Sequence, residues 1–162
     1  MTEIRTTLRE KIKPGKKIAI MGVGSVLRCD DGAGMLLIEK LSADIHAEDA
    51  LLIGGSTAPE NFTGVIRNYA PDVLFVVDAA HMGLKTGEIR TIGESDIGGL
   101  SFSTHMLPLP IMFSYLRMDT DCEIVCIGIQ PGSTEQGMEM SAEVRTAAEK
   151  LAGLFSEVLH GT

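Results

Sequence analysis

The sequence has no tryptophan, few aromatic residues and no long apolar segment, and each of these absences restricts what the protein can be. Only 4% of its 162 residues are aromatic. The apolar runs fall far short of the ~20 residues that a bilayer-spanning helix needs, and residues 1–17 are polar and of mixed charge. We therefore expect no membrane span, no secretory signal peptide and a cytoplasmic location.

Cysteine and basic residues are also scarce. Three cysteines without a framework spacing are untypical of a secreted protein. Fourteen Lys and Arg residues against 22 Asp and Glu give a net charge of −8, which opposes the positive surface that nucleic-acid binding requires, so we expect no nucleic-acid partner. A 162-residue chain can bury a core without disulfides, and we expect one domain over residues 1–162, with residues 1–15 as a short amphipathic N-terminal extension.

Several common catalytic motifs are absent from the sequence. It contains no GxxxxGK(S/T), GxSxG or HExxH, which excludes phosphate-loop, serine-elbow and common zinc-protease chemistry. The dinucleotide-binding fingerprint also fails, because Leu27 stands where its third glycine is needed, and Ile53 and Gly54 stand where an acidic residue should end the second strand.

The most informative segment that is present runs from Ile18 to Gly34. An apolar run closed by Gly22 predicts a buried strand, and apolar residues at helical spacing follow Gly34. Between the two, Asp30 and Asp31 lie close to the predicted helix N-terminus, where a carboxylate can cap exposed amides. Capping explains one aspartate better than two. Functional sites in open α/β sheets form at the carboxyl ends of the strands, where this loop would lie, so we take the pair as a candidate functional site.

A second acid occupies a comparable position. The apolar run 73–77 predicts a buried strand, and Asp78 comes directly after it, with His81 three residues later. His81 can join a site or simply lie on the surface. Further strands are predicted at residues 48–53, 87–92 and 123–131, and an amphipathic helix closes the chain at residues 141–160.

Asp31, Asp78 and His105 come from three loops at strand exits or helix entries. Together they form an oxygen and nitrogen ligand set that suits a borderline divalent ion such as nickel or zinc. Cys29 adjoins the aspartates, but a lone loop cysteine is more often inert, and we leave it out of the site.

Six sequence blocks, in matching order and spacing, make the chain similar to a known family. The blocks are residues 22–34 (with Cys-Asp-Asp-Gly-Ala-Gly at its end), 58–61 (Ala-Pro-Glu-Asn), 77–83 (Val-Asp-Ala-Ala-His-Met-Gly), 87–90 (Gly-Glu-Ile-Arg), 103–108 (Ser-Thr-His-Met-Leu-Pro) and 128–131 (Gly-Ile-Gln-Pro). They resemble the motifs of the [NiFe]-hydrogenase maturation endopeptidases. The resemblance is closest to the branch that processes the large subunit of energy-converting, formate-linked hydrogenases.

This resemblance implies a fold, a reaction and a site. The fold would be three-layer α/β/α, with a twisted, mainly parallel five-stranded sheet in the order 2-1-3-5-4 and strand 4 antiparallel. The protein would be a monomeric endopeptidase, aspartic-type by family, that removes the C-terminal extension of a [NiFe]-hydrogenase large-subunit precursor after nickel insertion. Asp31, Asp78 and His105 would be the catalytic residues and would bind nickel carried by the substrate, so no tightly bound cofactor of the protein's own is expected.

Two positions depart from the family pattern, and two other functions stay open. The family usually has Asn where this chain has Ser25, and commonly an acid where it has Gly54. The protein could instead be a metal-dependent hydrolase of small molecules, which would carry its own ion. It could also be a noncatalytic nickel-binding maturation chaperone, which would bind the precursor without cutting it.

Overall fold

A computed structural model of the chain describes residues 1–93, 101–102, 109–137 and 139–161. Its elements are α1 (Thr2–Lys11), β1 (Ile18–Val23), η1 (Cys29–Gly32), α2 (Ala33–Ser42), β2 (Leu51–Ser56), η2 (Pro59–Phe62), α3 (Thr63–Tyr69), β3 (Val73–His81), β4 (Ile89–Ile92), β5 (Ser101–Phe102), α5 (Leu109–Asp119), β6 (Glu123–Ile129) and α6 (Ala142–His160). Here η marks a 3₁₀ turn. None of the helices among these residues combines the length and apolarity of a membrane span.

The main sheet has the order β2-β1-β3-β6-β4. Neighbouring strands are parallel except for β4, which runs antiparallel to β6. This arrangement confirms the predicted strand order and the antiparallel fourth strand. The short strand β5 adds an antiparallel pairing to the end of β3, where Ala80 pairs with Phe102 and His81 with Ser101.

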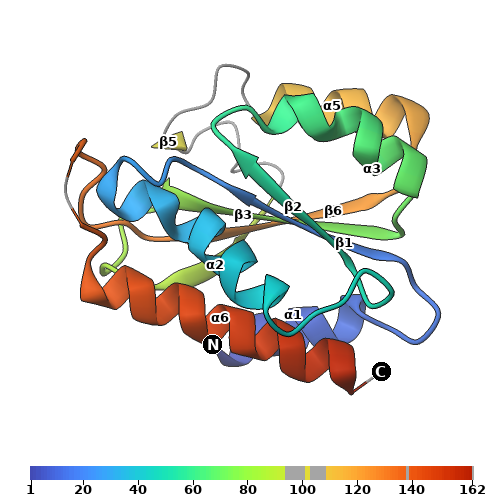
Figure 1. Cartoon of the computed structure of the whole chain (residues 1–162), viewed down its shortest axis with the longest axis horizontal. Helices are drawn as coiled ribbons and strands as arrows, with labels where there is room; N and C mark the ends of the chain where they lie inside the picture. The colour runs from blue at the N-terminus through green and yellow to red at the C-terminus, as the bar shows by residue number, and fades with distance from the viewer. Residues whose placement is uncertain (94–100, 103–108, 138, 162) are drawn as a thin grey trace.

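Helices cover both faces of the sheet, as predicted. Helices α1, α2 and α6 lie on one side, and α3 and α5 lie on the other (Figure 1). Strands β1 and β3 are buried almost throughout because they are central strands with helices on both faces. Residues 1–15, which we expected to form a short extension, contain α1, and α1 inserts Ile4 and Leu8 into the core.

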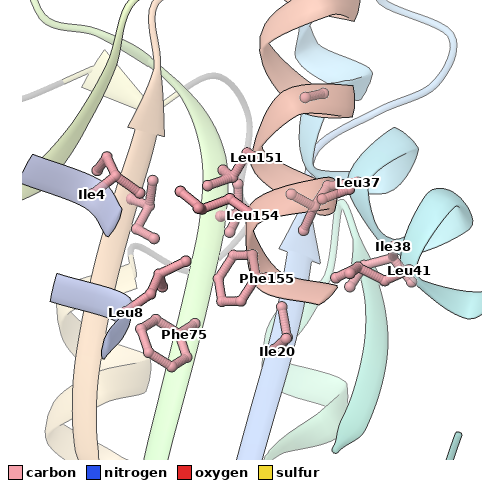
Figure 2. Packing of buried hydrophobic residues seen from close by; sticks show 14 of the residues in the cluster. Ile4, Leu8, Ile20, Leu37, Ile38, Leu41, Phe75, Leu151, Leu154 and Phe155 are labelled. Atoms are coloured by element: carbon pink, nitrogen blue, oxygen red, sulfur yellow. The ribbon is translucent and has the colours of Figure 1, made fainter. Parts of the chain in front are cut away.

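The larger core cluster lies between the sheet and α1, α2 and α6. Figure 2 shows Phe75 of β3 and Phe155 of α6 at its centre, and their rings meet edge to face with centroids 5.2 Å apart at 80°. At the start of α6, the hydroxyl of Ser141 accepts a hydrogen bond from the Val144 amide at 3.4 Å, which caps the helix. The core therefore fixes α2 and α6 side by side on one face of the sheet.

Two boundary predictions were wrong. Strand β2 covers Leu51–Ser56 and not residues 48–53, because the Gly54-Gly55 pair continues the strand through a bulge: Gly22 pairs with Gly54, but Val23 pairs with Ser56. Likewise, Asp78 does not follow β3 but lies within it, because it pairs with Gly128 of β6. Pairing with β5 then extends the strand to His81.

Candidate functional site

Two glycines bring the start of α2 against the ends of β1 and β3. A Cβ atom on Gly22 would lie 2.0 Å from the carbonyl oxygen of Gly34, and one on Gly34 would lie 2.4 Å from the carbonyl oxygens of Val23 and Val77. Only glycine permits this approach. It places η1, which carries Asp30 and Asp31, in contact with β3, which carries Asp78 one residue after Val77.

Asp31 is completely buried under the turn that follows β1. Its Oδ2 accepts a hydrogen bond from the backbone amide of Ser25 at 2.9 Å. Gly24 adopts φ +121° in the same turn, and a Cβ there would lie 1.8 Å from the Asp31 carbonyl oxygen. Because residue 25 contacts Asp31 through its backbone, the presence of Ser25 in place of the usual Asn leaves this hydrogen bond intact.

Asp78 is also completely buried, in the middle layer of the fold. It pairs in register with Gly128 of β6. Burial raises the pKa of the nearby Cys126 thiol, and the charge of Asp78 raises that pKa further. Cys126 is therefore a neutral thiol at physiological pH.

Asp30 is buried beside Asp31 but has a different role. Its Oδ2 accepts hydrogen bonds from the amides of Gly132 at 2.8 Å and Ser133 at 3.1 Å, and its Oδ1 accepts one from the amide of Ser141 at 2.7 Å. Burial raises the pKa of the Asp30 carboxyl, but these amide hydrogen bonds lower it more, so its pKa lies below the ordinary value. Asp30 thus ties η1 to the segment that leads into α6.

The capping interpretation of the aspartate pair is therefore wrong for α2. The residue before that helix is Gly32, and no side chain caps it. The helix end that Asp30 serves is that of α6, through the amide of its N-cap residue Ser141. Sequence reasoning missed this role because the amides that bind Asp30 come from more than 100 residues away along the chain.

Gln130 is a second buried polar residue whose structural role the sequence did not reveal. Its Oε1 accepts hydrogen bonds from the amides of Met82 at 2.8 Å and Leu84 at 3.2 Å. It therefore holds the loop that follows β3. The signal that could have found it is the Gly-Ile-Gln-Pro block, which places an amide side chain at the end of a buried strand.

The predicted third member of the site, His105, lies outside the described residues. His81, the other histidine considered from sequence, is exposed at the end of β3. Within the described ranges, no three His, Cys, Asp or Glu side chains are grouped to hold a metal ion. The structure thus brings Asp31 and Asp78 to contacting elements as two buried carboxylates, which can bind a divalent cation or accept a proton.

Comparison with known proteins gives a consistent result. A family model described as hydrogenase maturation protease, HycI, matches residues 35–157. The chain is 38% identical to the hydrogenase 3 maturation protease of Escherichia coli K12 over 131 residues, which cover 80% of this chain and 83% of that protein. It is 33% identical to a putative hydrogenase maturation protease of Methanocaldococcus jannaschii over 163 residues, 96% of each chain.

A solved structure matches at the level of the whole fold. The crystal structure of a [NiFe] hydrogenase maturation protease HycI from Thermococcus kodakarensis KOD1 has a TM-score of 0.87 to this chain at 36% identity. The match covers 95% of this chain and 99% of that one.

The fold and the two buried carboxylates, one in η1 and one within β3, define an α/β protein with its candidate site near the carboxyl edge of the sheet. The comparisons make the class specific. This chain belongs to the hydrogenase maturation protease family, as the sequence motifs predicted.

Proposed function

We propose that the protein is an endopeptidase that removes the C-terminal extension of a [NiFe]-hydrogenase large-subunit precursor once nickel has been inserted. The observation that carries this proposal is the placement of two fully buried carboxylates, Asp31 and Asp78, on contacting elements at one edge of the sheet, in a chain of this family. We also propose that the protein acts on this precursor in the cytoplasm and as a monomer.

Nickel enters this account as part of the substrate. We propose that Asp31, Asp78 and His105 contact the nickel ion of the precursor, whose remaining ligands belong to the precursor itself. Two carboxylates in a low-dielectric environment repel each other, and a divalent cation between them replaces that repulsion with attraction. The metal would then hold the scissile peptide beside the protease and report that loading is complete.

Water activation would proceed by one of two routes that these residues allow. In the aspartic-type route, one carboxylate is the general base that takes a proton from the attacking water. In the other route, nickel polarises the peptide carbonyl or the water while both carboxylates act as ligands. Asn variants separate them, because a neutral amide cannot take the proton and also binds a divalent cation more weakly than a carboxylate does.

The test uses Asp31→Asn, Asp78→Asn and His105→Ala with nickel-loaded precursor. We expect each variant to fold and each to fail to release the extension, as measured by the mass of the precursor. A variant that binds the nickel-loaded precursor normally but does not cut it identifies a base, whereas one that loses binding identifies a ligand. Wild-type cleavage rates in any variant remove that residue from the site.

Two measurements distinguish the rival functions. If the protein retains one metal ion per chain after dialysis against a chelator, the small-molecule hydrolase is favoured. Tight binding requires that the protein itself supplies enough ligands, whereas in our proposal the substrate supplies part of the coordination. If the wild-type protein forms a stable complex with nickel-loaded precursor and never cuts it, the chaperone is favoured.

A further inference from the structure

A cleft of about 620 Å³ opens beside the turn that carries the candidate site. It lies between the N-terminal parts of α2 and α6, which run side by side in Figure 1. Its volume is in the range of clefts that bind small molecules or peptide side chains. The apolar side chains that line it are Val26, Met35, Leu36, Ile38 and Met140.

The cleft adjoins the candidate site at the η1 turn. Cys29 and Gly32, the first and last residues of η1, line the cleft, and Asp30 and Asp31 lie between them. The opposite wall, which includes Glu139, is tied to the same turn. The Cys29 thiol donates a hydrogen bond to the Glu139 carbonyl oxygen at 3.1 Å.

Asp30 reinforces this connection through its hydrogen bond from the amide of Ser141, one residue beyond the cleft-lining Met140. The rim carries three exposed charged residues, Glu39, Glu139 and Arg145. Their sum is negative, so the rim favours a ligand with a positive charge next to its apolar part.

Gly54 influences the shape of the cleft from the far side of α2. A Cβ atom at position 54 would lie 3.1 Å from Cε and 3.9 Å from Sδ of Met35. The glycine thus makes room for the Met35 thioether between β2 and the cleft. A larger residue at position 54 would displace the end of the Met35 side chain, which lines the cleft, and so change the shape of the cleft.

Resting on the proposed function, we infer that this cleft binds an apolar side chain of the precursor's C-terminal extension, flanked by a basic residue, and that Met35 and Gly54 determine which side chain fits. Because the cleft adjoins the candidate site, it can hold the chain segment on one side of the scissile bond while the metal site binds the segment on the other side. Methionine suits this role, since its flexible thioether adapts to irregular apolar surfaces.

The variants that test this inference place a charge in the cleft. Met35→Glu does so from α2, and Met140→Glu does so from the opposite wall, which lies outside any helix, so one variant remains informative if the other does not fold. Met118→Glu is the matched control, because Met118 is 81% exposed on α5, on the other face of the sheet. Thermal unfolding checks that all three are folded.

Cleavage of nickel-loaded precursor gives the first readout. We expect both cleft variants to raise KM about tenfold or more, with kcat close to that of the wild type, since a hydrophobic subsite contributes binding of this size and takes no part in the chemistry. Met118→Glu should behave as wild type. A cleft variant that lowers kcat at unchanged KM, or that matches Met118→Glu, overturns the inference and leaves the proposed function standing.

Binding gives a second readout that does not require cleavage. The probe is a fluorescent synthetic peptide with the sequence of the extension, and a second peptide carries Ala at its apolar positions. We expect the wild type to bind the first peptide more tightly than the second, and Met35→Glu to bind both equally weakly. Equal affinity of the wild type for both peptides overturns the inference. Failure of the wild type to cut nickel-loaded precursor, by contrast, overturns the proposed function.

Discussion

Replacing Asp30 with alanine should destabilise the fold strongly, although this residue is not assigned to the site. The side chain is completely buried and accepts three hydrogen bonds from backbone amides of the segment before α6. Each amide would lose a charged acceptor, which costs roughly 1–1.5 kcal/mol when the amide is only partly buried. We therefore expect Asp30→Ala to lower the free energy of unfolding by about 3–5 kcal/mol.

The assay is urea unfolding followed by circular dichroism at pH 7. Asp44→Ala is the control, because Asp44 is exposed on the surface after α2, and its replacement should change stability by less than about 0.5 kcal/mol. If Asp30→Ala unfolds at the same urea concentration as the control, then the Asp30 carboxylate does not anchor η1 to α6, and our account of both the turn and the cleft wall is wrong.

The stability difference between the wild type and Asp30→Ala should also depend on pH. The pKa of Asp30 in the folded protein lies below its ordinary value of 3.8, so the unfolded chain takes up the proton first as the pH falls. The contribution of the carboxylate to stability is complete above that ordinary value and is lost as the pH falls through the lower, folded-state pKa. The difference should thus stay constant from pH 7 to about pH 5 and shrink below pH 4; a difference that grows on acidification would contradict this.

Four further substitutions test the packing of the fold and the contacts around the site. Gly34→Ala should destabilise the fold by about 1–3 kcal/mol or more and reduce cleavage, because its Cβ would lie 2.4 Å from two strand carbonyl oxygens. Gly153→Ala in α6 should instead stabilise the fold by about 0.5–1 kcal/mol, because no atom lies within 4 Å of the added Cβ. Phe155→Ala should cost about 3–5 kcal/mol, measured by urea unfolding, because it removes a fully buried ring from the core. Ser25→Ala should cleave precursor at a rate close to that of the wild type, because the contact with Asp31 is made by the backbone amide; a large loss of activity would assign a role to the hydroxyl.

The sequence predicted the architecture well because hydrophobic periodicity and strand topology are local or rule-bound. The buried runs that begin at Ile18 and Val73 became adjacent parallel strands, so the acids near their carboxyl ends reached the same edge of the sheet. Glycine was harder to interpret. The Gly54-Gly55 pair has the composition of a turn, but in the fold it is a bulge within β2, and the two cases differ in long-range pairing that local composition does not encode.

The candidate site was predicted in part. The strand pattern predicted that Asp31 and Asp78 lie at one edge of the sheet, but it did not predict their complete burial. We expected both in loops. Asp31 instead lies beneath a glycine turn, and Asp78 lies inside a strand. The sequence also did not predict that Asp30 has a structural role while Asp31 belongs to the candidate site. That structural role depends on the amides of Gly132, Ser133 and Ser141, which only the folded chain brings to Asp30. The role of His105 stays a prediction.

The most direct test of the central claim is the intact mass of the large-subunit precursor after incubation with this protein. Two precursor samples are needed, one loaded with nickel and one free of it, each incubated with the wild type and with Asp31→Asn. Our account predicts that only the wild type, and only with nickel-loaded precursor, yields a product shorter by the C-terminal extension. Cleavage of both precursor samples, or of neither, would contradict it.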